Sequence, residues 1–284
     1  MKTGMILEGG AMRGMYTAGV LDVMLENDIW VDGYIGVSAG AIFGCNYKSK
    51  QIGRIIRYTT TYSKDPRYSS LKSWRETGNL YNVEFCYHTI PEKYDLFDEE
   101  TFRNNPIDFY VVCTDIHTGK PVYHLCNVAD APEVEWMRAS AAMPLASKPV
   151  CVDGYEMLDG GISDSIPISW FMKKGYEKNI VILTQHDGYQ KKKSKMQPLF
   201  KLFLKDYPAV AKCMERRHLK YNASVAKVKK LEKMGKALVI QPSEKLKISR
   251  TEKDPDKLWE VYYLGRKDAL AKLEAMKAFV KKEN

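Results

Sequence analysis

The sequence predicts an α/β fold with a central, mostly parallel sheet, and two observations carry that prediction. The apolar run Met5-Ile6-Leu7 stops at Glu8-Gly9-Gly10, and apolar residues at helical spacings follow from Arg13 to Asn27. The same unit recurs at once, with a strand over 34–37, Ser38 at the turn and a small-residue helix over 39–45. Two successive strand–turn–helix units favour parallel strands joined by right-handed crossovers.

The middle of the chain is less regular. Residues 59–105 are polar and aromatic, with Pro66, Gly78 and Pro91 interspersed, and we expect helices and loops there that form a lid. Residues 109–113 and 122–125 predict a strand pair joined by a turn over 118–121. A helix over 133–142 should be stopped by Pro144.

The remaining elements complete the sheet and add a helical region. An apolar strand precedes Asp159-Gly160-Gly161, a helix is expected over 168–174, and 180–183 reads as a buried strand. The sheet ends there or with Leu238-Val239-Ile240. From Lys191 the composition predicts Lys-rich helices over 196–234 and 255–282, so we place a soft boundary near residue 188 between two regions, 1–188 and 189–284.

Composition excludes several classes of protein. The 284 residues carry a net charge of +9, with 28% charged and 11% aromatic residues, which rules out disordered, collagen-like and disulfide-framework chains. The charge is uneven, at −7 over residues 1–170 and +16 over 171–284. The basic part should meet a phospholipid surface or nucleic acid, or else form a solvated helical face.

The sequence also bears on location. No segment reaches the ~18 consecutive apolar residues of a membrane span, and the opening MKTGMILEGG has no signal-peptide hydrophobic region, so we expect a cytoplasmic protein. The six cysteines contain no C-x-x-C pair and are predicted to be buried free thiols.

A first chemical motif is Gly36-Val37-Ser38-Ala39-Gly40, which fits G-x-S-x-G between a strand and a helix. This is the context of a nucleophile elbow, where glycines allow a sharp turn that presents the serine. A buried turn with a solvated serine would have the same pattern.

The second motif is the segment Gly9-Gly10-Ala11-Met12-Arg13-Gly14, which also follows a strand and opens a helix. Its backbone N–H groups should converge on an anion. Asp32 lies at the distance at which a dinucleotide fold has its ribose-binding acid, but the spacing is not G-x-G-x-x-G. An oxyanion hole fits equally well and gives Ser38 a partner.

The base for Ser38 has two candidates. His186, just after the strand at 180–183, is the one histidine that could reach a site at the sheet edge. Asp159 is the better candidate, because it ends an apolar strand and is followed by Gly160 and Gly161. An Asp at such a place is also a common turn residue.

These motifs in this order, together with Arg138-Ala139-Ser140-Ala141-Ala142-Met143-Pro144, resemble the patatin-like phospholipase family over residues 4–185. The resemblance implies a three-layer α/β/α sandwich that hydrolyses lipid esters by a Ser–Asp dyad without histidine. No cofactor is expected, and no metal, because no clustered carboxylates indicate a metal site. It assigns Ser38 as nucleophile, Asp159 as proton acceptor and the amides around Gly9, Gly10 and Ala11 as oxyanion hole, with Ala39 adding one more. It makes 1–188 the catalytic domain.

Arg13 matches the family's basic position in the glycine loop. Ala11 departs from the family, which usually has a third glycine there, and a positive φ at this residue would cost about 1–2 kcal/mol.

The expected substrates are phospholipids, lysophospholipids or related fatty esters, and a catalytically silent lipid-binding protein is the alternative. Within 191–207, apolar residues from Leu199 to Tyr207 share one helical arc beside several lysines, which predicts an interfacial amphipathic helix or a helix packed on the core. Anionic membrane is therefore the expected partner. Nucleic acid is not, because no helix-turn-helix, zinc-finger or RRM signature accompanies the charge.

Overall fold

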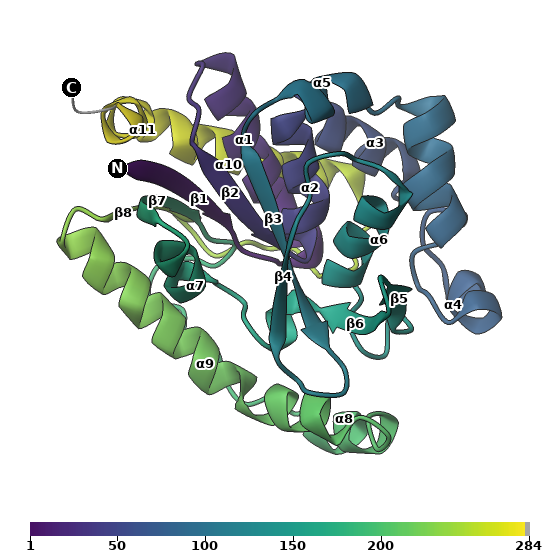
Figure 1. Ribbon diagram of the computed structural model, residues 1–284. Helices are drawn as coiled ribbons and strands as arrows, with labels where there is room; N and C mark the ends of the chain where they lie inside the picture. The colour runs from purple at the N-terminus through teal and green to yellow at the C-terminus, as the bar shows by residue number, and fades with distance from the viewer. Residues whose placement is uncertain (282–284) are drawn as a thin grey trace.

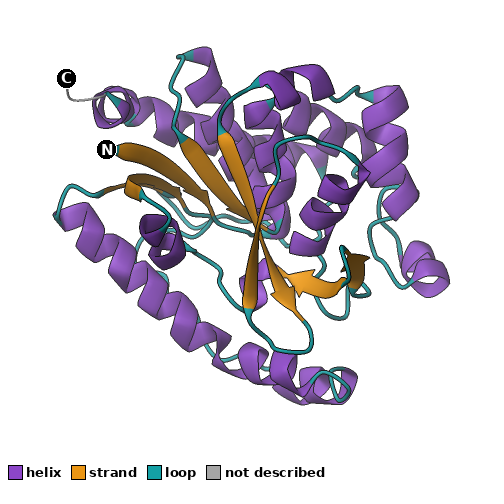
Figure 2. Cartoon of the chain, in the orientation of Figure 1, coloured by secondary structure: helices purple, strands orange, loops and turns teal. Residues whose placement is uncertain are grey.

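A single eight-stranded sheet forms the centre of the computed structural model, which describes residues 1–281 (Figure 1, Figure 2). The strands run in the order β5-β6-β3-β2-β1-β7-β8, with β4 also paired to β3. Pairs β1–β2, β1–β7, β2–β3 and β7–β8 are parallel, and pairs of β3 with β4 and β6, and of β5 with β6, are antiparallel. The strands are β1 (Lys2–Leu7), β2 (Gly33–Val37), β3 (Asp108–Asp115), β4 (Pro121–Leu125), β5 (Val150–Val152), β6 (Tyr155–Asp159), β7 (Tyr176–Ile182) and β8 (Ala237–Ile240).

Helices cover both faces of the sheet, which confirms the α/β/α sandwich (Figure 1). Alternate residues of β1 point to opposite faces. Met5 and Leu7 join the core under α1 (Met15–Glu26), α2 (Ala39–Lys48) and α6 (Ala131–Ser140). Ile6 joins a second core under α7 (Ile168–Lys173) and α9 (Pro208–Lys233).

The C-terminal helices are part of the same body as the N-terminal motifs. Helix α10 (Pro255–Ala271) packs directly on α1. A Cβ added at Gly19 would lie 2.1 Å from the Tyr262 carbonyl oxygen, and one at Gly265 would lie 2.1 Å from that of Tyr16. Glycine at both positions therefore allows the two helix backbones to approach closely.

The irregular middle segment contains the helices and loops expected there. They are α3 (Arg54–Tyr62), α4 (Leu71–Thr77), the π-helix η2 (Phe85–Tyr94) and α5 (Glu99–Asn104). The strand pair β3–β4 is antiparallel across the predicted turn. Strand β8 also belongs to the sheet, so the sheet extends past β7 to the second of its two predicted ends.

Both long C-terminal helices were predicted wrongly as continuous. The first is two helices, α8 (Gln197–Phe203) and α9, because Pro208 has no N–H to donate to the preceding turn and instead opens α9 at its first position. The second is α10 and α11 (Leu273–Val280), separated at Lys272. The last residue of the predicted range 255–282 lies outside the described residues.

All six cysteines are free, as predicted, but only Cys113 and Cys126 are buried; Cys45, Cys86 and Cys213 are half-buried, and Cys151 is exposed. Its strand β5 is at the edge of the sheet, which leaves one side uncovered. Within residues 1–281, no helix combines the length and the apolar character needed to cross a membrane.

Candidate active site

Ser38 occupies a strained turn between β2 and α2. Its φ of 55° and ψ of −123° lie in a region that residues with a Cβ rarely adopt, at a cost of about 1–3 kcal/mol. The Ser38 N–H donates to the Ser140 hydroxyl at 2.9 Å, and that hydroxyl donates to the Val112 carbonyl at 2.6 Å. A side chain at the end of α6 therefore fixes the strained turn to β3.

Steric constraints explain why this turn has glycine at positions 36 and 40. A Cβ at Gly36 would lie 2.4 Å from the Gly40 carbonyl oxygen, and a Cβ at Gly40 would lie 2.4 Å from that of Leu7. Real Cβ atoms do not approach so closely, so both positions exclude any larger residue. The G-x-S-x-G motif thus forms the sharp strand-to-helix connection that the sequence predicted.

The glycine loop lies directly against Ser38. It connects β1 to α1 through the short helix η1 (Ala11–Gly14), and a Cβ at Gly9 would lie 2.7 Å from the Cβ of Ser38. Within the described chain, the backbone N–H groups of Gly9, Gly10, Ala11 and Ala39 donate no hydrogen bond. Free amides beside a serine hydroxyl can stabilise a developing oxyanion.

Other residues of the loop have structural constraints. Ala11 has a φ of 50°, which is the strained conformation that the missing third glycine would have relieved. Met12 is buried and its N–H donates to the Arg250 carbonyl at 3.4 Å. A Cβ at Gly14 would lie 2.6 Å from the Phe43 ring, so this position packs η1 on α2.

Asp159 ends β6 and is only 1% exposed. Burial raises the pKa of its carboxyl, although the nearby Ser38 hydroxyl, the Arg217 guanidinium and the Gly161 N–H each lower it. Oδ1 accepts from the Gly161 N–H at 2.7 Å, whereas Oδ2 is buried and has no hydrogen-bond partner in residues 1–281. The carboxyl therefore keeps one acceptor free and is a stronger base than a solvated carboxylate.

The backbone around Asp159 is also held in place. Its carbonyl accepts from the Thr114 hydroxyl at 2.8 Å, and its N–H donates to the Ala142 carbonyl at 2.9 Å. A Cβ at Gly160 would lie 2.0 Å from the Val112 carbonyl oxygen, and one at Gly161 would lie 3.0 Å from Asp159 Oδ1. These close approaches account for both glycines of the DGG motif.

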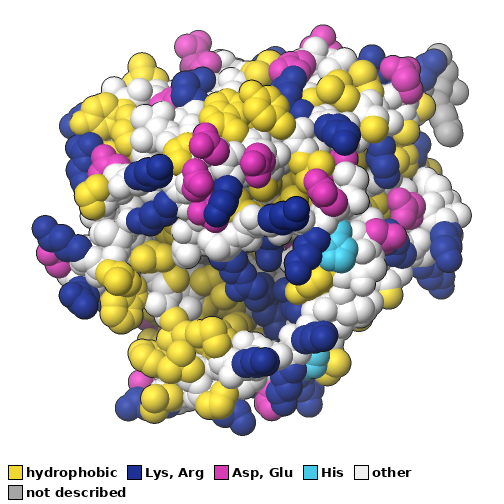
Figure 3. Space-filling view, turned by 180° about the vertical axis from the view of Figure 1, so that it is seen from behind, with side chains coloured by type: hydrophobic (Ala, Val, Ile, Leu, Met, Phe, Trp, Pro, Cys, Tyr) yellow, Lys and Arg dark blue, Asp and Glu magenta, His cyan; other side chains and the backbone are white. Residues whose placement is uncertain are grey.

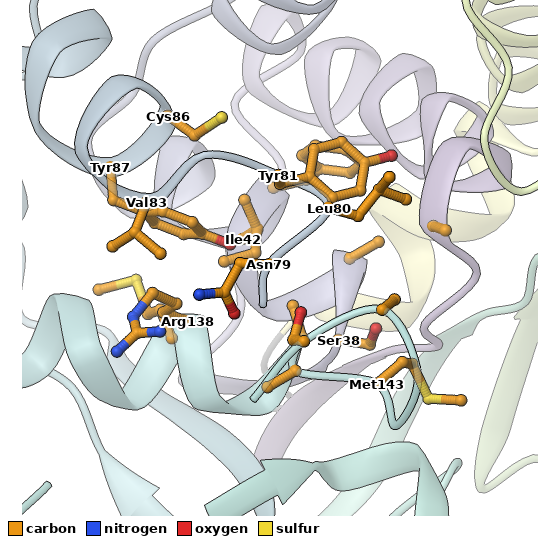
Figure 4. Close-up of a pocket in the computed structure, with 18 of the residues that line it drawn as sticks. Ser38, Ile42, Asn79, Leu80, Tyr81, Val83, Cys86, Tyr87, Arg138 and Met143 are labelled. Atoms are coloured by element: carbon orange, nitrogen blue, oxygen red, sulfur yellow. The ribbon is translucent and has the colours of Figure 1, made fainter. Parts of the chain in front are cut away.

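A large apolar cavity opens at Ser38. It has a volume of about 540 Å³ and extends between α2 and the segment of α3 and η2 (Figure 4). In Figure 4, Leu80 and Tyr81 lie across the cavity from Ser38 and Met143. Apolar side chains dominate its wall, among them Ile42, Phe43, Tyr58, Leu80, Tyr81, Val83, Tyr87 and Ile90. Its size and lining suit a hydrocarbon chain.

A smaller, polar cavity of about 50 Å³ shares Ser38 with the first. Ala11, Met143 and Arg250 also line both cavities. The small cavity contains Asp159 and Glu8 together with four basic side chains, which are Arg13, Lys191, Arg217 and Arg250. Burial, and after it Arg217, Arg250 and Arg13, lower the pKa of Lys191 to about 7, while Glu8 opposes them.

The structure separates the predicted candidates. Ser38, Asp159 and the glycine loop come together, whereas His186 lines neither cavity and its Nδ1 lies 2.6 Å from the Asp187 carbonyl oxygen. Asp32 accepts from the Thr3 N–H at 2.8 Å, at the opposite end of β1 from the glycine loop. It is therefore not placed to bind a ribose beside that loop.

Several residues of the site were not predicted. Ser140 lies in a block that the sequence analysis quoted, but without a role. Lys191, Arg217 and Arg250 belong to the basic C-terminal region, where many lysines and arginines surround them in the sequence and none is distinguished by spacing.

Comparisons with known proteins agree with the motifs. The profile of the patatin-like phospholipase family matches residues 5–172, and a domain of unknown function, DUF6363, matches residues 207–281. The uncharacterized protein YjjU of Escherichia coli K12 is 32% identical over 188 residues, which are 63% of this chain and 51% of that protein. The chain thus spans about half the length of YjjU.

Lysophospholipase nte1 of Aspergillus fumigatus is 28% identical over 171 residues, 58% of this chain and 11% of that protein. The patatin-like phospholipase domain-containing protein ZK370.4 of Caenorhabditis elegans is 29% identical over 170 residues, 58% of this chain and 12% of that protein. Among solved structures, VipD from Legionella pneumophila aligns with a TM-score of 0.47 at 11% identity, over 97% of this chain and 67% of that one.

Proposed function

Because the chain belongs to the patatin-like phospholipase family, whose profile covers more than half of it, we propose that this lipid hydrolase cleaves carboxylic esters with a Ser38–Asp159 dyad. The observation that carries the proposal is the buried, unpaired Oδ2 of Asp159 beside a strained serine that opens into an apolar cavity. The substrates are phospholipids, lysophospholipids or related fatty esters.

In the proposed reaction, Ser38 Oγ attacks the ester carbonyl carbon while Asp159 takes the hydroxyl proton. The free N–H groups of the glycine loop and Ala39 hold the oxyanion of the tetrahedral intermediate. The intermediate collapses, the alcohol leaves with the proton from Asp159, and an acyl-serine remains. Water then attacks this ester, again giving its proton to Asp159, and the fatty acid leaves as Ser38 regains a proton.

The dyad is tested with Ser38→Ala and Asp159→Asn on a chromogenic fatty ester. Loss of a nucleophile or of its base should lower kcat by about 10³-fold or more, because such residues act as a unit. His186→Ala is the matched control and should retain activity. Wild-type activity in either dyad variant would refute the assignment, and loss of activity in the histidine variant would indicate a triad instead.

A silent lipid-binding protein is the alternative within the same fold. Labelling with a fluorophosphonate distinguishes the two, because the probe reacts only with an activated serine. We expect stoichiometric labelling of the wild type and none of Ser38→Ala. An unlabelled wild type that still binds fatty acid would favour the silent protein.

Helix α8 supports the proposed contact with anionic membrane. Leu199, Leu202 and Phe203 are 38%, 66% and 54% exposed, and several exposed lysines lie beside them. Figure 3, seen from behind, shows hydrophobic and basic side chains gathered here, next to a hollow into which basic side chains project. Phe200 and Leu204, from the same predicted arc, are instead buried.

The position of α8 connects this surface to the substrate. Phe200 and the neighbouring Met196 line the apolar cavity, so a lipid that leaves a bilayer at α8 would meet the cavity at once. Each lysine near an anionic surface contributes about 1 kcal/mol, so binding should be weak and reversible. We propose further that the protein works in the cytoplasm at the membrane surface. We also propose that residues 1–188 form its catalytic domain.

Vesicle cosedimentation tests the membrane contact. Leu202→Glu and Phe203→Glu should abolish binding to vesicles containing phosphatidylglycerol, while Leu219→Glu, on the exposed side of α9, should not. Equal binding to vesicles with and without anionic lipid would refute the proposed role of the lysines in membrane contact.

A further inference from the structure

The small cavity beside Ser38 contains more positive than negative charge. Four basic side chains, those of Arg13, Lys191, Arg217 and Arg250, share it with two carboxyls, those of Glu8 and Asp159. None of the four bases makes an ion pair within 4.0 Å anywhere in residues 1–281. Elsewhere on the molecule, Arg57 and Arg266 do form short ion pairs with carboxylates.

Partial burial of Arg13, Lys191 and Arg217 makes this arrangement costly in the absence of an anion. Desolvation lowers the pKa of Arg13, Lys191 and Arg217, and these groups and Arg250 repel one another. The Nε of Arg13 is buried and has no hydrogen-bond partner in the described chain. Unneutralised cations of this kind are characteristic of a site that receives an anionic group.

The fixed contacts of the bases leave their charges directed at the cavity. The Nε of Arg217 donates to the Gly161 carbonyl, which positions the guanidinium next to Asp159. The Nζ of Lys191 lies 4.2 Å from the centre of the Tyr221 ring. Arg250 is held by its carbonyl, which accepts from the Met12 N–H, so its exposed side chain is free to follow a ligand.

We propose that Lys191, Arg217 and Arg250 of the C-terminal region, together with Arg13, bind the phosphate group of a glycerophospholipid whose ester lies at Ser38. This inference rests on the proposed function, because it places the phosphate relative to the reacting ester. The acyl chain occupies the apolar cavity and the phosphate occupies the cationic one, so the ester between them lies where the two cavities meet.

Charge favours phosphate over a neutral headgroup. The four bases exceed the two carboxyls, so a phosphate diester or monoester offsets the surplus and a diacylglycerol does not. Guanidinium groups also match the oxygen pairs of a phosphate in bidentate geometry. The four basic side chains therefore determine which substrate binds, while Ser38 and Asp159 cleave its ester bond.

The test uses dihexanoyl lipids below their critical micelle concentrations, so that no membrane contact through α8 contributes. Wild-type protein, Lys191→Met and Arg250→Met are compared on dihexanoyl phosphatidylglycerol and dihexanoylglycerol. We expect the wild type to prefer the phosphatidylglycerol, and each variant to lower the ratio of the two kcat/KM values by about 30-fold. Lys192→Met and Arg216→Met, exposed neighbours outside the cavity, should leave the ratio unchanged.

Inorganic phosphate provides a second readout. It should inhibit hydrolysis of dihexanoyl phosphatidylglycerol competitively, with an inhibition constant about tenfold higher in Lys191→Met than in wild type. If hydrolysis of both lipids falls equally in the variants and phosphate does not compete, the phosphate site is refuted while the hydrolase stands. If wild-type protein hydrolyses neither lipid and Ser38 is not labelled by fluorophosphonate, the proposed function fails first.

Discussion

The two cavities that meet at Ser38 differ in size, in lining and in origin. The apolar cavity of about 540 Å³ is formed chiefly by residues before 150, whereas the cationic cavity of about 50 Å³ takes three of its four bases from residues after 188. In the proposed complex, one cavity gains free energy by removing hydrocarbon from water, and the other by neutralising partly buried charge. Under the proposed function, the N-terminal motifs carry out the reaction, and the C-terminal region contributes part of the substrate recognition.

The largest expected effect on kcat is at Ser38, where the two cavities meet, because a change there should affect every substrate alike. Gly9→Ala would place a methyl group 2.7 Å from both the Ser38 Cβ and the Val37 carbonyl oxygen, so we expect kcat to fall by about 10²-fold or more on every ester, as for the loss of an oxyanion donor. Gly154→Ala is the control for backbone strain alone, because its Cβ would meet nothing within 4 Å but its φ of 78° strains any residue other than glycine; the free energy of unfolding should fall while kcat stays unchanged. An effect on only one class of ester would mean that the cavities do not share a reaction centre.

A smaller, selective effect is expected in the apolar cavity. Ile42→Trp should fill part of it and lower kcat/KM for a palmitoyl ester about tenfold more than for a butyryl ester, because buried area supports the longer chain. Ile52→Trp, at an exposed position outside the cavity, is the control. Equal losses with both chain lengths would show that the acyl chain lies elsewhere.

The cationic cavity should respond to pH where the apolar one does not. Lys191, whose pKa is about 7, faces Arg217, Arg250, Arg13, Glu8 and the ring of Tyr221. The lysine is charged below this pKa and becomes neutral above it. The preference for dihexanoyl phosphatidylglycerol over dihexanoylglycerol should therefore fall about 3- to 10-fold between pH 6 and 8.5.

The phosphate diester keeps a single charge over this range, so the lipid itself does not titrate. In Lys191→Met the preference should be flat with pH. A slope that persists in this variant would assign the titration to another group and would contradict the role of Lys191.

The smallest expected effect is on stability, and it comes from backbone strain in the glycine loop and not from the lining of either cavity. Ala11 has a φ of 50°, so Ala11→Gly should raise the free energy of unfolding by about 0.5–1 kcal/mol, the relief of strain being partly offset by the entropy of the unfolded chain. Urea denaturation measures this change. A loss of stability would show that the Ala11 methyl group contributes packing that outweighs its backbone strain.

The sequence predicted the motifs around Ser38 far better than the basic side chains that share the small cavity with them. Local patterns specify the turns at Ser38 and Gly9 and the strand before Asp159, because each depends on glycines that close backbone approaches require. The same patterns predicted the parallel sheet and the antiparallel pair β3–β4. Such turns and strands can be predicted because a few adjacent residues specify each of them.

The cationic cavity is a tertiary property and left no comparable signal. Arg217 lies on a long basic helix and Arg250 in a loop, and only packing selects them from the other bases of the region. Ser140 likewise supports Ser38 from 102 residues away. The break at Pro208 was readable in principle, but a periodic pattern of apolar residues continued across it.

Strand β8 has a consequence for any attempt to isolate the N-terminal part. It pairs with β7 in parallel, from Asn179–Ala237 to Ile182–Ile240. A chain shortened at residue 188 would lose this strand and leave the apolar β7 as an open edge, which invites strand pairing between molecules. Such a fragment should therefore aggregate, even though all the catalytic motifs precede the cut.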